Sequence, residues 1–266
     1  MQGQHVLITG AAGGIGVALA RVFLEQGANV SLHYHRTVDT LTSLLEQYTD
    51  RCDALSVNAT DEQAVIKGVE QSCAHFGLIN VCIVNHAIYV DEDRPIWDMS
   101  LEQWQRTLDV NLTSYFLYSR EWCRQLKRLK PTTNVETLNA SLILIGSTAG
   151  KFGEAHHLDY ATSKGALHSG FIKSLKNEIV HIVPHARCNV VAPGWTRTPM
   201  AETAIEQGKH FKALRTTALR KVASVDDVAQ ACLFFASNKT AGHITGNILM
   251  VHGGMEGRVL WQEDLS

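Results

Sequence analysis

Short apolar runs rich in β-branched residues alternate along the chain with longer segments whose apolar residues recur at helical spacing. The short runs predict strands over residues 5–9, 29–34, 54–57, 79–85, 141–145, 187–192 and 247–251. The longer segments predict helices over residues 15–26, 38–50, 61–76, 101–130, 160–181 and 225–237. Because such alternation is typical of βαβ units, we expect a Rossmann-like, doubly wound α/β sheet of about seven parallel strands with helices on both faces.

The pattern predicts a single domain over residues 1–266, because no Ser/Gly-rich linker or internal repeat divides the chain. Residues 131–140 are polar and predict a surface loop, whereas residues 194–223 predict one or two short helices after the sixth strand. In open parallel sheets, ligands bind beyond the carboxyl ends of the strands. We therefore expect residues 194–223 to form a lid over the substrate.

The composition favours small-molecule partners. The chain carries 24 Lys and Arg against 26 Asp and Glu, with no long basic run for nucleic acid and no apolar stretch long enough to span a membrane. Its six cysteines are scattered without a C-x-x-C pair, which is typical of reduced thiols in a cytoplasmic protein. The N-terminus enters a strand almost at once, so we expect no secretory signal.

Histidine is frequent, with 13 residues, but its spacing does not predict a metal site. His33 and His35 alternate on one apparent strand and therefore share a face, yet no carboxylate or thiol at ligand spacing joins them. We expect no metal.

A glycine-rich turn, T-G-A-A-G-G-I-G, follows the first predicted strand and opens the first predicted helix. Gly10, Gly14 and Gly16 would let the backbone approach a pyrophosphate closely, and the helix N-terminus around Ile15 would offer it unpaired N–H groups. The spacing differs from the G-x-G-x-x-G of the general dinucleotide fingerprint. By itself, the turn is equally compatible with a plain tight turn.

Tyr160 is followed four positions later by Lys164. Residues four apart on a helix project from the same face, so this phenol and ammonium can meet one substrate together. Ser147 lies 13 positions upstream, after the fifth predicted strand, and Asn111 lies in the long helical segment. The motifs V-N-H-A-I and P-G-W-T-R-T-P end or follow further strands, so all of these residues are predicted to converge on one site.

Together, T-G-x-x-x-G-I-G, Asn111, Ser147, the Tyr160/Lys164 pair and P-G-W-T-R-T resemble the short-chain dehydrogenase/reductase family over nearly the whole chain. Within it, the chain most resembles the single-domain ketone and 3-oxoacyl reductases. The resemblance implies that Asn111, Ser147, Tyr160 and Lys164 are catalytic, with Lys164 on the nicotinamide ribose and a water at Asn111 linking Lys164 to solvent. It also implies cofactor contacts from Gly10, Gly14, Ile15, Gly16, Tyr34, His35, Arg36, Asn58, Ala59, Asn85, Tyr160, Lys164, Pro193, Gly194, Thr196 and Thr198.

The chain departs from the family pattern at two places. It has Asn85, His86, Ala87 and Ile88 where N-N-A-G is common, and Asn58 where an aspartate contacts adenine. An asparagine still accepts and donates hydrogen bonds, so adenine binding is compatible with Asn58. His86 and Ile88 are expected to change the shape of the pocket and not the type of reaction.

Reduction of a carbonyl by hydride leaves negative charge on oxygen, so the site must supply a proton and a hydrogen bond there. Tyr160 can give the proton and Ser147 the hydrogen bond. An isolated phenol has a pKa of about 10, and Lys164 provides a cation that would favour the phenolate. We expect reversible hydride transfer between a nicotinamide and a small-molecule ketone or secondary alcohol, with carbonyl reduction as the physiological direction.

Other readings of these residues remain open. Taken singly, they could be a packed helix Tyr, a Lys extended along a helix, a strand-end Ser and a helix-capping Asn. Alternative functions on the same fold are imine reduction, a non-redox biosynthetic step, or a regulatory protein that senses NADP without turnover. The presence of Ser147, Tyr160, Lys164 and Asn111 together argues for catalysis.

NADP(H) is favoured over NAD(H) as the cofactor. Tyr34 stands where NAD sites carry an acid, about twenty positions beyond the glycines, and His35 and Arg36 follow it. A guanidinium can grip a 2'-phosphate bidentately. The alternative is that Arg36 only caps a solvated loop and that NAD(H) is used.

The helices predicted over 101–130 and 160–181 carry more apolar surface than one sheet face would cover. In relatives these helices pack between subunits, so the resemblance implies a homodimer or homotetramer.

Overall fold

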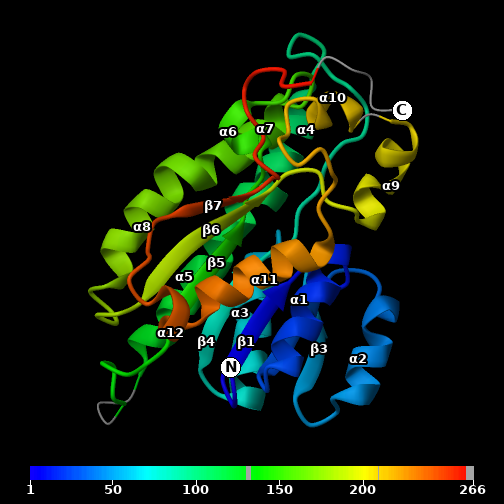
Figure 1. Ribbon diagram of the computed structural model, residues 1–266. Helices are drawn as coiled ribbons and strands as arrows, with labels where there is room; N and C mark the ends of the chain where they lie inside the picture. Colours follow the sequence, from blue (N-terminus) through cyan, green and yellow to red (C-terminus); the bar gives the residue numbers. More distant parts are fainter. Residues whose placement is uncertain (130–132, 209, 262–266) are drawn as a thin grey trace.

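The computed structural model describes residues 1–129, 133–208 and 210–261. Within them lies one sheet of seven strands, β1 (His5–Thr9), β2 (Asn29–Tyr34), β3 (Cys52–Ser56), β4 (Ile79–Val84), β5 (Ser141–Ile145), β6 (Arg187–Pro193) and β7 (Ile248–Val251). All neighbouring pairs are parallel, in the order β3-β2-β1-β4-β5-β6-β7. The predicted Rossmann-like sheet is confirmed (Figure 1). The predicted helix end at residue 130, the start of the loop 131–140, residue 209 and residues 262–266 lie outside the described residues.

Helices cover both faces of the sheet (Figure 1). They are α1 (Gly14–Glu25), η1 (Asp39–Leu41), α2 (Thr42–Gln47), α3 (Glu62–Phe76), α4 (Leu101–Leu108), η2 (Asp109–Thr113), α5 (Ser114–Lys127), α6 (Ala149–Phe152), α7 (Leu158–Ala166), η3 (Leu167–Phe171), α8 (Ile172–Ile179), α9 (Pro199–Glu206), α10 (Phe211–Leu214), α11 (Val225–Ala236) and α12 (Asn238–Ala241). Val6 and Ile8 pack in one apolar cluster with α1, α2 and α11, whereas Leu7 packs in the other with α3, α5 and α8. Successive strand side chains point to opposite faces, so β1 contributes to both clusters. Strand β2 contributes Val30 and Leu32 to the first cluster and presents the polar Ser31 and His33 to the other face.

Two helices predicted as continuous contain a π-helical turn. The segment predicted over 101–130 is divided into α4, η2 and α5, and the segment predicted over 160–181 into α7, η3 and α8. A π turn inserts an extra residue without changing the polarity of the sequence, so the apolar pattern did not reveal it. The turn η2 contains Asn111, and η3 begins directly after the helix that bears Lys164.

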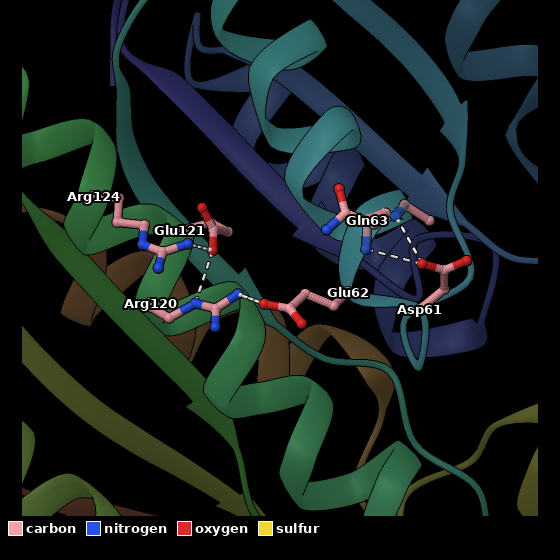
Figure 2. A network of polar contacts seen from close by, with 7 residues as sticks. Asp61, Glu62, Gln63, Arg120, Glu121 and Arg124 are labelled. Atoms are coloured by element: carbon pink, nitrogen blue, oxygen red, sulfur yellow. Dashed lines mark hydrogen bonds and ion pairs between the residues drawn. The ribbon is translucent and has the colours of Figure 1, made fainter.

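A surface network connects α3 to α5 (Figure 2). Asp61 caps α3 by accepting hydrogen bonds from two backbone N–H groups of its first turn. Arg120 pairs with Glu62 at 2.6 Å and with Glu121 at 2.9 Å, and Arg124 also pairs with Glu121, at 2.8 Å. The Glu62 side chain is exposed, so its pair with Arg120 contributes little free energy of folding, whereas Glu121 is buried and has its charge matched by two guanidinium groups. The apolar cluster beneath α3 and α5 packs both helices on the sheet.

Two buried histidines are placed under the helices of that face. The ring of His5 is hydrogen-bonded to the Gly77 carbonyl and the Ser31 hydroxyl, each at 2.9 Å. The ring of His33 is hydrogen-bonded to the hydroxyls of Tyr118 at 3.1 Å and Ser72 at 3.0 Å. Burial lowers the pKa of His5 to about 4 and that of His33 to about 3. Both rings are therefore neutral in the folded chain at neutral pH.

We expect the free energy of unfolding to fall with pH below about 6.5, the usual histidine pKa. The folded-state pKa values lie below the unfolded one, so the unfolded chain binds more protons between about pH 6.5 and 4 and gains population there. Each such histidine contributes a slope of up to about 1.4 kcal/mol per pH unit. Urea unfolding at pH 7 and pH 5 should show a smaller loss for His33→Gln than for the wild type. The exposed-site control His181→Gln should keep the wild-type slope, and equal slopes in all three proteins would contradict the assignment.

Candidate active site

A cavity of about 1410 Å³ lies at the carboxyl ends of the strands and receives residues that follow β1, β2, β4, β5 and β6. Ligands of open parallel sheets bind at this edge. The cavity is lined by most of the predicted site residues, namely Gly10, Gly14, Ile15, Tyr34, His35, Arg36, Asn58, Ala59, Asn85, Ser147, Tyr160, Lys164, Pro193, Gly194, Thr196 and Thr198. Gly16 and Asn111 are not among the lining residues.

The glycine-rich turn requires close backbone approach. Gly10 has a φ of +60°, and a Cβ placed on it would lie 2.7 Å from the Cα atom of His86. A Cβ on Gly16 would lie 2.3 Å from the carbonyl oxygen of Gly10, so Gly16 closes the turn from behind the cavity. Helix α1 starts after Gly13 without a side-chain cap and without an acidic residue in its first turn. Its first N–H groups therefore suit an anion such as a pyrophosphate.

Polar side chains fix the loop ends beside this turn. The Asn85 amide donates to the carbonyls of Thr9 and Gly10, each at 3.1 Å, which holds the end of β4 against the end of β1. The Asn58 side-chain oxygen accepts from the Thr60 backbone N–H at 3.2 Å and from its hydroxyl at 2.9 Å. The oxygen of Asn58 is thus engaged in its own turn, and its amide N–H₂ group is the part left to act as a donor.

His86, one of the departures from the family pattern, is a structural residue. Its ring nitrogens are hydrogen-bonded to the hydroxyls of Thr9 at 2.7 Å and Ser114 at 2.6 Å, so it joins β1 to α5. Burial, followed by the charge of Lys164, lowers the pKa of His86 to about 3. The imidazole is neutral, and both of its nitrogens already have partners.

At the adenosine end, the lining residues that follow β2 are Tyr34, His35, Arg36, Thr37 and Thr40. None of these is a carboxylate. Arg36 is exposed and forms no ion pair with any described residue. Its guanidinium therefore keeps all its donors for an anion or for water.

Ser147, Tyr160 and Lys164 line the same cavity. Burial raises the pKa of Tyr160 to about 12, and a hydrogen bond with Ser147 acts in the opposite direction. Lys164 is fully buried, and loss of solvation lowers its pKa to about 7. The phenol is therefore protonated at neutral pH, whereas the amine is close to its midpoint.

The contacts of Lys164 differ from the expectation that its ammonium stands beside the Tyr160 hydroxyl and lowers the phenol pKa. Its Nζ donates to the Tyr115 hydroxyl at 3.1 Å and to the Ile145 carbonyl at 2.9 Å, and it lies 5.9 Å from the centre of the Tyr160 ring. The charge of Lys164 is not among the causes that shift the pKa of Tyr160. Burial without an anionic partner lowers the pKa of the amine instead, so the expected phenolate-stabilising field is weak in this arrangement.

Tyr115 is a site residue that the sequence reasoning missed. It is fully buried, and its hydroxyl donates toward the carbonyls of His86 at 2.9 Å and Ile145 at 3.2 Å. A signal was present, because Tyr115 follows Asn111 by four positions and therefore shares a helix face with it. Tyrosine is so common on core helix faces that the spacing alone did not indicate a polar role.

Asn111 is fully buried and faces the loop after β4. Its side-chain oxygen accepts from the Ile88 N–H and its amide donates to the Ile88 carbonyl, both at 2.8 Å. This pair of bonds fixes the backbone of a residue that lines the cavity. The side chain of Asn111 thus shapes the wall without forming part of it.

Loop residues close the remaining walls. Thr198 caps α9 by accepting from the Ala201 N–H at 3.3 Å, and the Thr196 hydroxyl donates to the Gly194 carbonyl at 3.0 Å. Tyr89 and Glu154 also line the cavity near Tyr160 and were not predicted. Both lie in irregular loops, where residue spacing carries no information about direction.

Within the described ranges, no group of three or more His, Cys, Asp or Glu side chains could hold a metal ion. None of the helices within those ranges is both long and apolar enough to cross a membrane.

The chain is similar to known proteins along nearly its whole length. A family model described as "Enoyl-(Acyl carrier protein) reductase" matches residues 10–256. The 3-oxoacyl-[acyl-carrier-protein] reductase FabG of Escherichia coli K12 is 30% identical over 260 residues, covering 96% of this chain and 98% of that protein. Nodulation protein G of Rhizobium sp. N33 is 32% identical over 255 residues, with the same coverage of 96% and 98%.

Solved structures agree with the sequence relatives. A short-chain dehydrogenase/reductase from Brucella melitensis, titled glucose/ribitol dehydrogenase, superposes with a TM-score of 0.84 at 26% identity, covering 96% of this chain and 98% of that one. A short-chain dehydrogenase/reductase from Serratia marcescens gives a TM-score of 0.83 at 25% identity, covering 95% and 98%. With the glycine-rich turn, Ser147, Tyr160 and Lys164 on one cavity, the chain belongs to the short-chain dehydrogenase/reductase family of oxidoreductases.

Proposed function

We propose that the protein is an NADP(H)-dependent reductase that transfers hydride reversibly between the nicotinamide and a ketone or secondary alcohol, with carbonyl reduction as its physiological direction. The observation that supports this most is that Ser147, Tyr160 and Lys164 share one cavity with the uncapped N-terminus of α1. The names of the relatives, which include 3-oxoacyl reductases, agree with carbonyl substrates.

The protonation states of the site suit reduction. The nicotinamide would supply the hydride, and the residues of the chain handle the resulting charge on oxygen. Tyr160, with a pKa raised to about 12, carries the proton that this oxygen needs, and Ser147 lies beside it to donate a hydrogen bond. Lys164, with a pKa lowered to about 7, can gain and lose a proton near neutrality. Its Nζ contacts Tyr115 and Ile145, so we propose that a water carries the proton between Lys164 and Tyr160.

Tyr115 positions Lys164 in this scheme. Its hydroxyl accepts from the Lys164 ammonium while it donates toward backbone carbonyls, so it stabilises the charged form of an amine that burial otherwise neutralises. The resemblance implied a water at Asn111 in the proton route. We propose that Asn111 acts on the site through Ile88, and that Tyr115 is the side-chain partner of Lys164.

The adenosine end supports NADP(H) over NAD(H). No carboxylate among the described lining residues after β2 would repel a 2'-phosphate, and the exposed guanidinium of Arg36 is available to bind it. The regulatory alternative, binding of NADP without turnover, is disfavoured because the proton-transfer residues line the same cavity as the cofactor turn. Imine reduction and a non-redox step on the same site remain the chemical alternatives that substrate assays decide.

We also propose a cytoplasmic homodimer or homotetramer with residues 194–223 as a substrate lid. One observation supports the oligomer and another supports the lid. Exposed apolar side chains gather on and before α4 and on α5, at Ile96, Trp97, Leu101 and Phe116. The segment 194–223 supplies α9 and α10, and several of its residues line the cavity.

Replacement of Tyr160 tests the reaction. Tyr160→Phe removes the proton donor and keeps the ring, so we expect kcat to fall by about 10²–10⁴-fold while the affinity for NADPH stays nearly unchanged. The assay follows NADPH absorbance with a panel of ketones, quinones and 3-oxoacyl thioesters, and fluorescence titration measures NADPH binding. Tyr48→Phe, outside the cavity, is the control. Wild-type rates in Tyr160→Phe would refute the assignment.

Replacement of Tyr115 tests the positioning of Lys164. Tyr115→Phe removes an acceptor from the ammonium, so the pKa of Lys164 should fall further. The alkaline limb of the kcat profile, where the protonated amine is lost, should then move to lower pH, with kcat at pH 7 reduced by about tenfold. Tyr118→Phe is the matched control, because it is an equally buried tyrosine on α5 whose hydroxyl contacts His33. If both variants show the same pH profile, Tyr115 has only a packing role.

Replacement of Arg36 tests the cofactor preference. A hydrogen bond to a charged group is worth about 1.5–3 kcal/mol, so Arg36→Ala should raise the KM for NADPH by about 10- to 100-fold. The KM for NADH should change by less than about threefold, since NADH lacks the 2'-phosphate. Arg21→Ala, which breaks a surface ion pair with Asp226, is the control. An equal loss for both cofactors would exclude the proposed contact.

A further inference from the structure

A carboxylate stands close to the reacting phenol. Glu154 lies in the loop between α6 and α7, and its Oε1 atom accepts a hydrogen bond from the Tyr89 hydroxyl at 3.0 Å. The Tyr89 ring meets the Tyr160 ring edge-on, with centroids 5.1 Å apart. Glu154 and Tyr160 are therefore separated by about one aromatic ring, and both line the cavity.

The charge of Glu154 has no cationic partner among the described Lys and Arg side chains. Within the described residues, its only side-chain hydrogen bond is the one from Tyr89, which uses one of its two oxygens. His157, on the same loop, has its Nε2 atom 3.1 Å from Asp93. Burial raises the pKa of Glu154, and the Tyr89 bond and His157 oppose that shift. An oxygen of this carboxylate thus remains for a ligand in the cavity.

The apolar walls of the cavity include Trp195, Met200, Ala204, Ala213 and Met255. The hydroxyls of Thr196 and Thr198 and the charged residues Asp91, Glu102, Arg106 and Asp109 also line the cavity. A polyhydroxylated substrate would lose water from several hydroxyls against the apolar walls without gaining hydrogen bonds. An apolar skeleton with one polar group toward Glu154 satisfies both kinds of surface.

We propose that the substrate is a ketone with an apolar skeleton and a protonated amine, whose carbonyl oxygen lies at Ser147 and Tyr160 and whose ammonium pairs with Glu154. This inference rests on the proposed carbonyl reduction. Pairing with a cation offsets the free-energy cost of desolvating a half-buried carboxylate better than a hydrogen bond from a neutral donor does. An anion at the same place is repelled. Glu154 and Tyr89 are then specificity residues, not proton donors in the reaction.

The test compares three cyclic ketones of similar shape and different charge. They are N-methyl-4-piperidone, which is cationic when protonated, the neutral 4-methylcyclohexanone, and the anionic 4-oxocyclohexanecarboxylate. With the wild type and NADPH at pH 7, we expect kcat/KM for the cation to exceed that for the neutral ketone by about tenfold, and the anion to be the poorest. A quaternary dimethyl-4-piperidinium ketone, which has no N–H donor, separates the effect of charge from that of hydrogen bonding.

Two variants assign the preference to Glu154. Glu154→Gln should lower kcat/KM for the cation by about tenfold, mostly through KM, and leave the neutral ketone within about twofold. Glu92→Gln is the matched control, since it removes an exposed carboxylate that pairs with Arg94 outside the cavity. Tyr89→Phe keeps the ring and removes the hydroxyl bound to Glu154, so it should also change KM for the cation alone.

The outcomes distinguish a failure of the pairing between Glu154 and a substrate amine from a failure of the proposed carbonyl reduction. Turnover of the neutral ketone with no preference for the cation would overturn the inference and leave carbonyl reduction intact. The same conclusion would follow from equal losses for cation and neutral ketone in Glu154→Gln, or from a polyhydroxylated ketone that is reduced more efficiently than the cation. Absence of turnover with every ketone would instead contradict carbonyl reduction itself.

Discussion

The parallel direction of every strand is the constraint on which the site depends. Because all seven described strands run the same way, the loops that follow them meet at one edge of the sheet. The glycine turn, Asn85, Ser147 and Gly194 come from four different loops, yet they line one cavity. The loops after β1 and β4 are in backbone contact, because a Cβ atom on Gly10 would clash with the backbone of His86. The amide of Asn85 then fixes the two loops at hydrogen-bond distance.

The elements predicted correctly from the sequence are those set by burial and by the periodicity of apolar residues. The strands His5–Thr9, Asn29–Tyr34 and Ser141–Ile145 were predicted with the bounds found in the structure, because they are short apolar runs that are largely buried. The bounds of β3 were shifted, since its first residues, Cys52 and Asp53, do not read as an apolar run. The long helices were predicted without their π turns, because an added residue leaves the apolar composition unchanged.

The sequence did not show which way the side chains of the site point or how far they are buried. A spacing of four placed Tyr160 and Lys164 on one helix face, and both do line the cavity, but the spacing could not show that the Lys164 ammonium would be directed at Tyr115. Asn111 was expected at the catalytic centre, whereas its amide is fully occupied by the Ile88 backbone. Tyr89 and Glu154 come from loops whose conformation depends on tertiary contacts, such as the bond between their own side chains.

Burial sets the proton balance of the proposed reaction. Removal of water disfavours the charged form of each group, so it acts in opposite directions on an acid and a base: the phenol of Tyr160 keeps its proton and the amine of Lys164 gives its proton up more easily. A site with a protonated phenol is ready to donate to an alkoxide, as carbonyl reduction requires, whereas alcohol oxidation needs the phenolate first. The carboxylate of Glu154 acts in the same direction, because its charge further disfavours the phenolate of Tyr160. A bound cation beside Glu154 would offset that field, so the charge of the substrate and the protonation of Tyr160 are linked through one side chain.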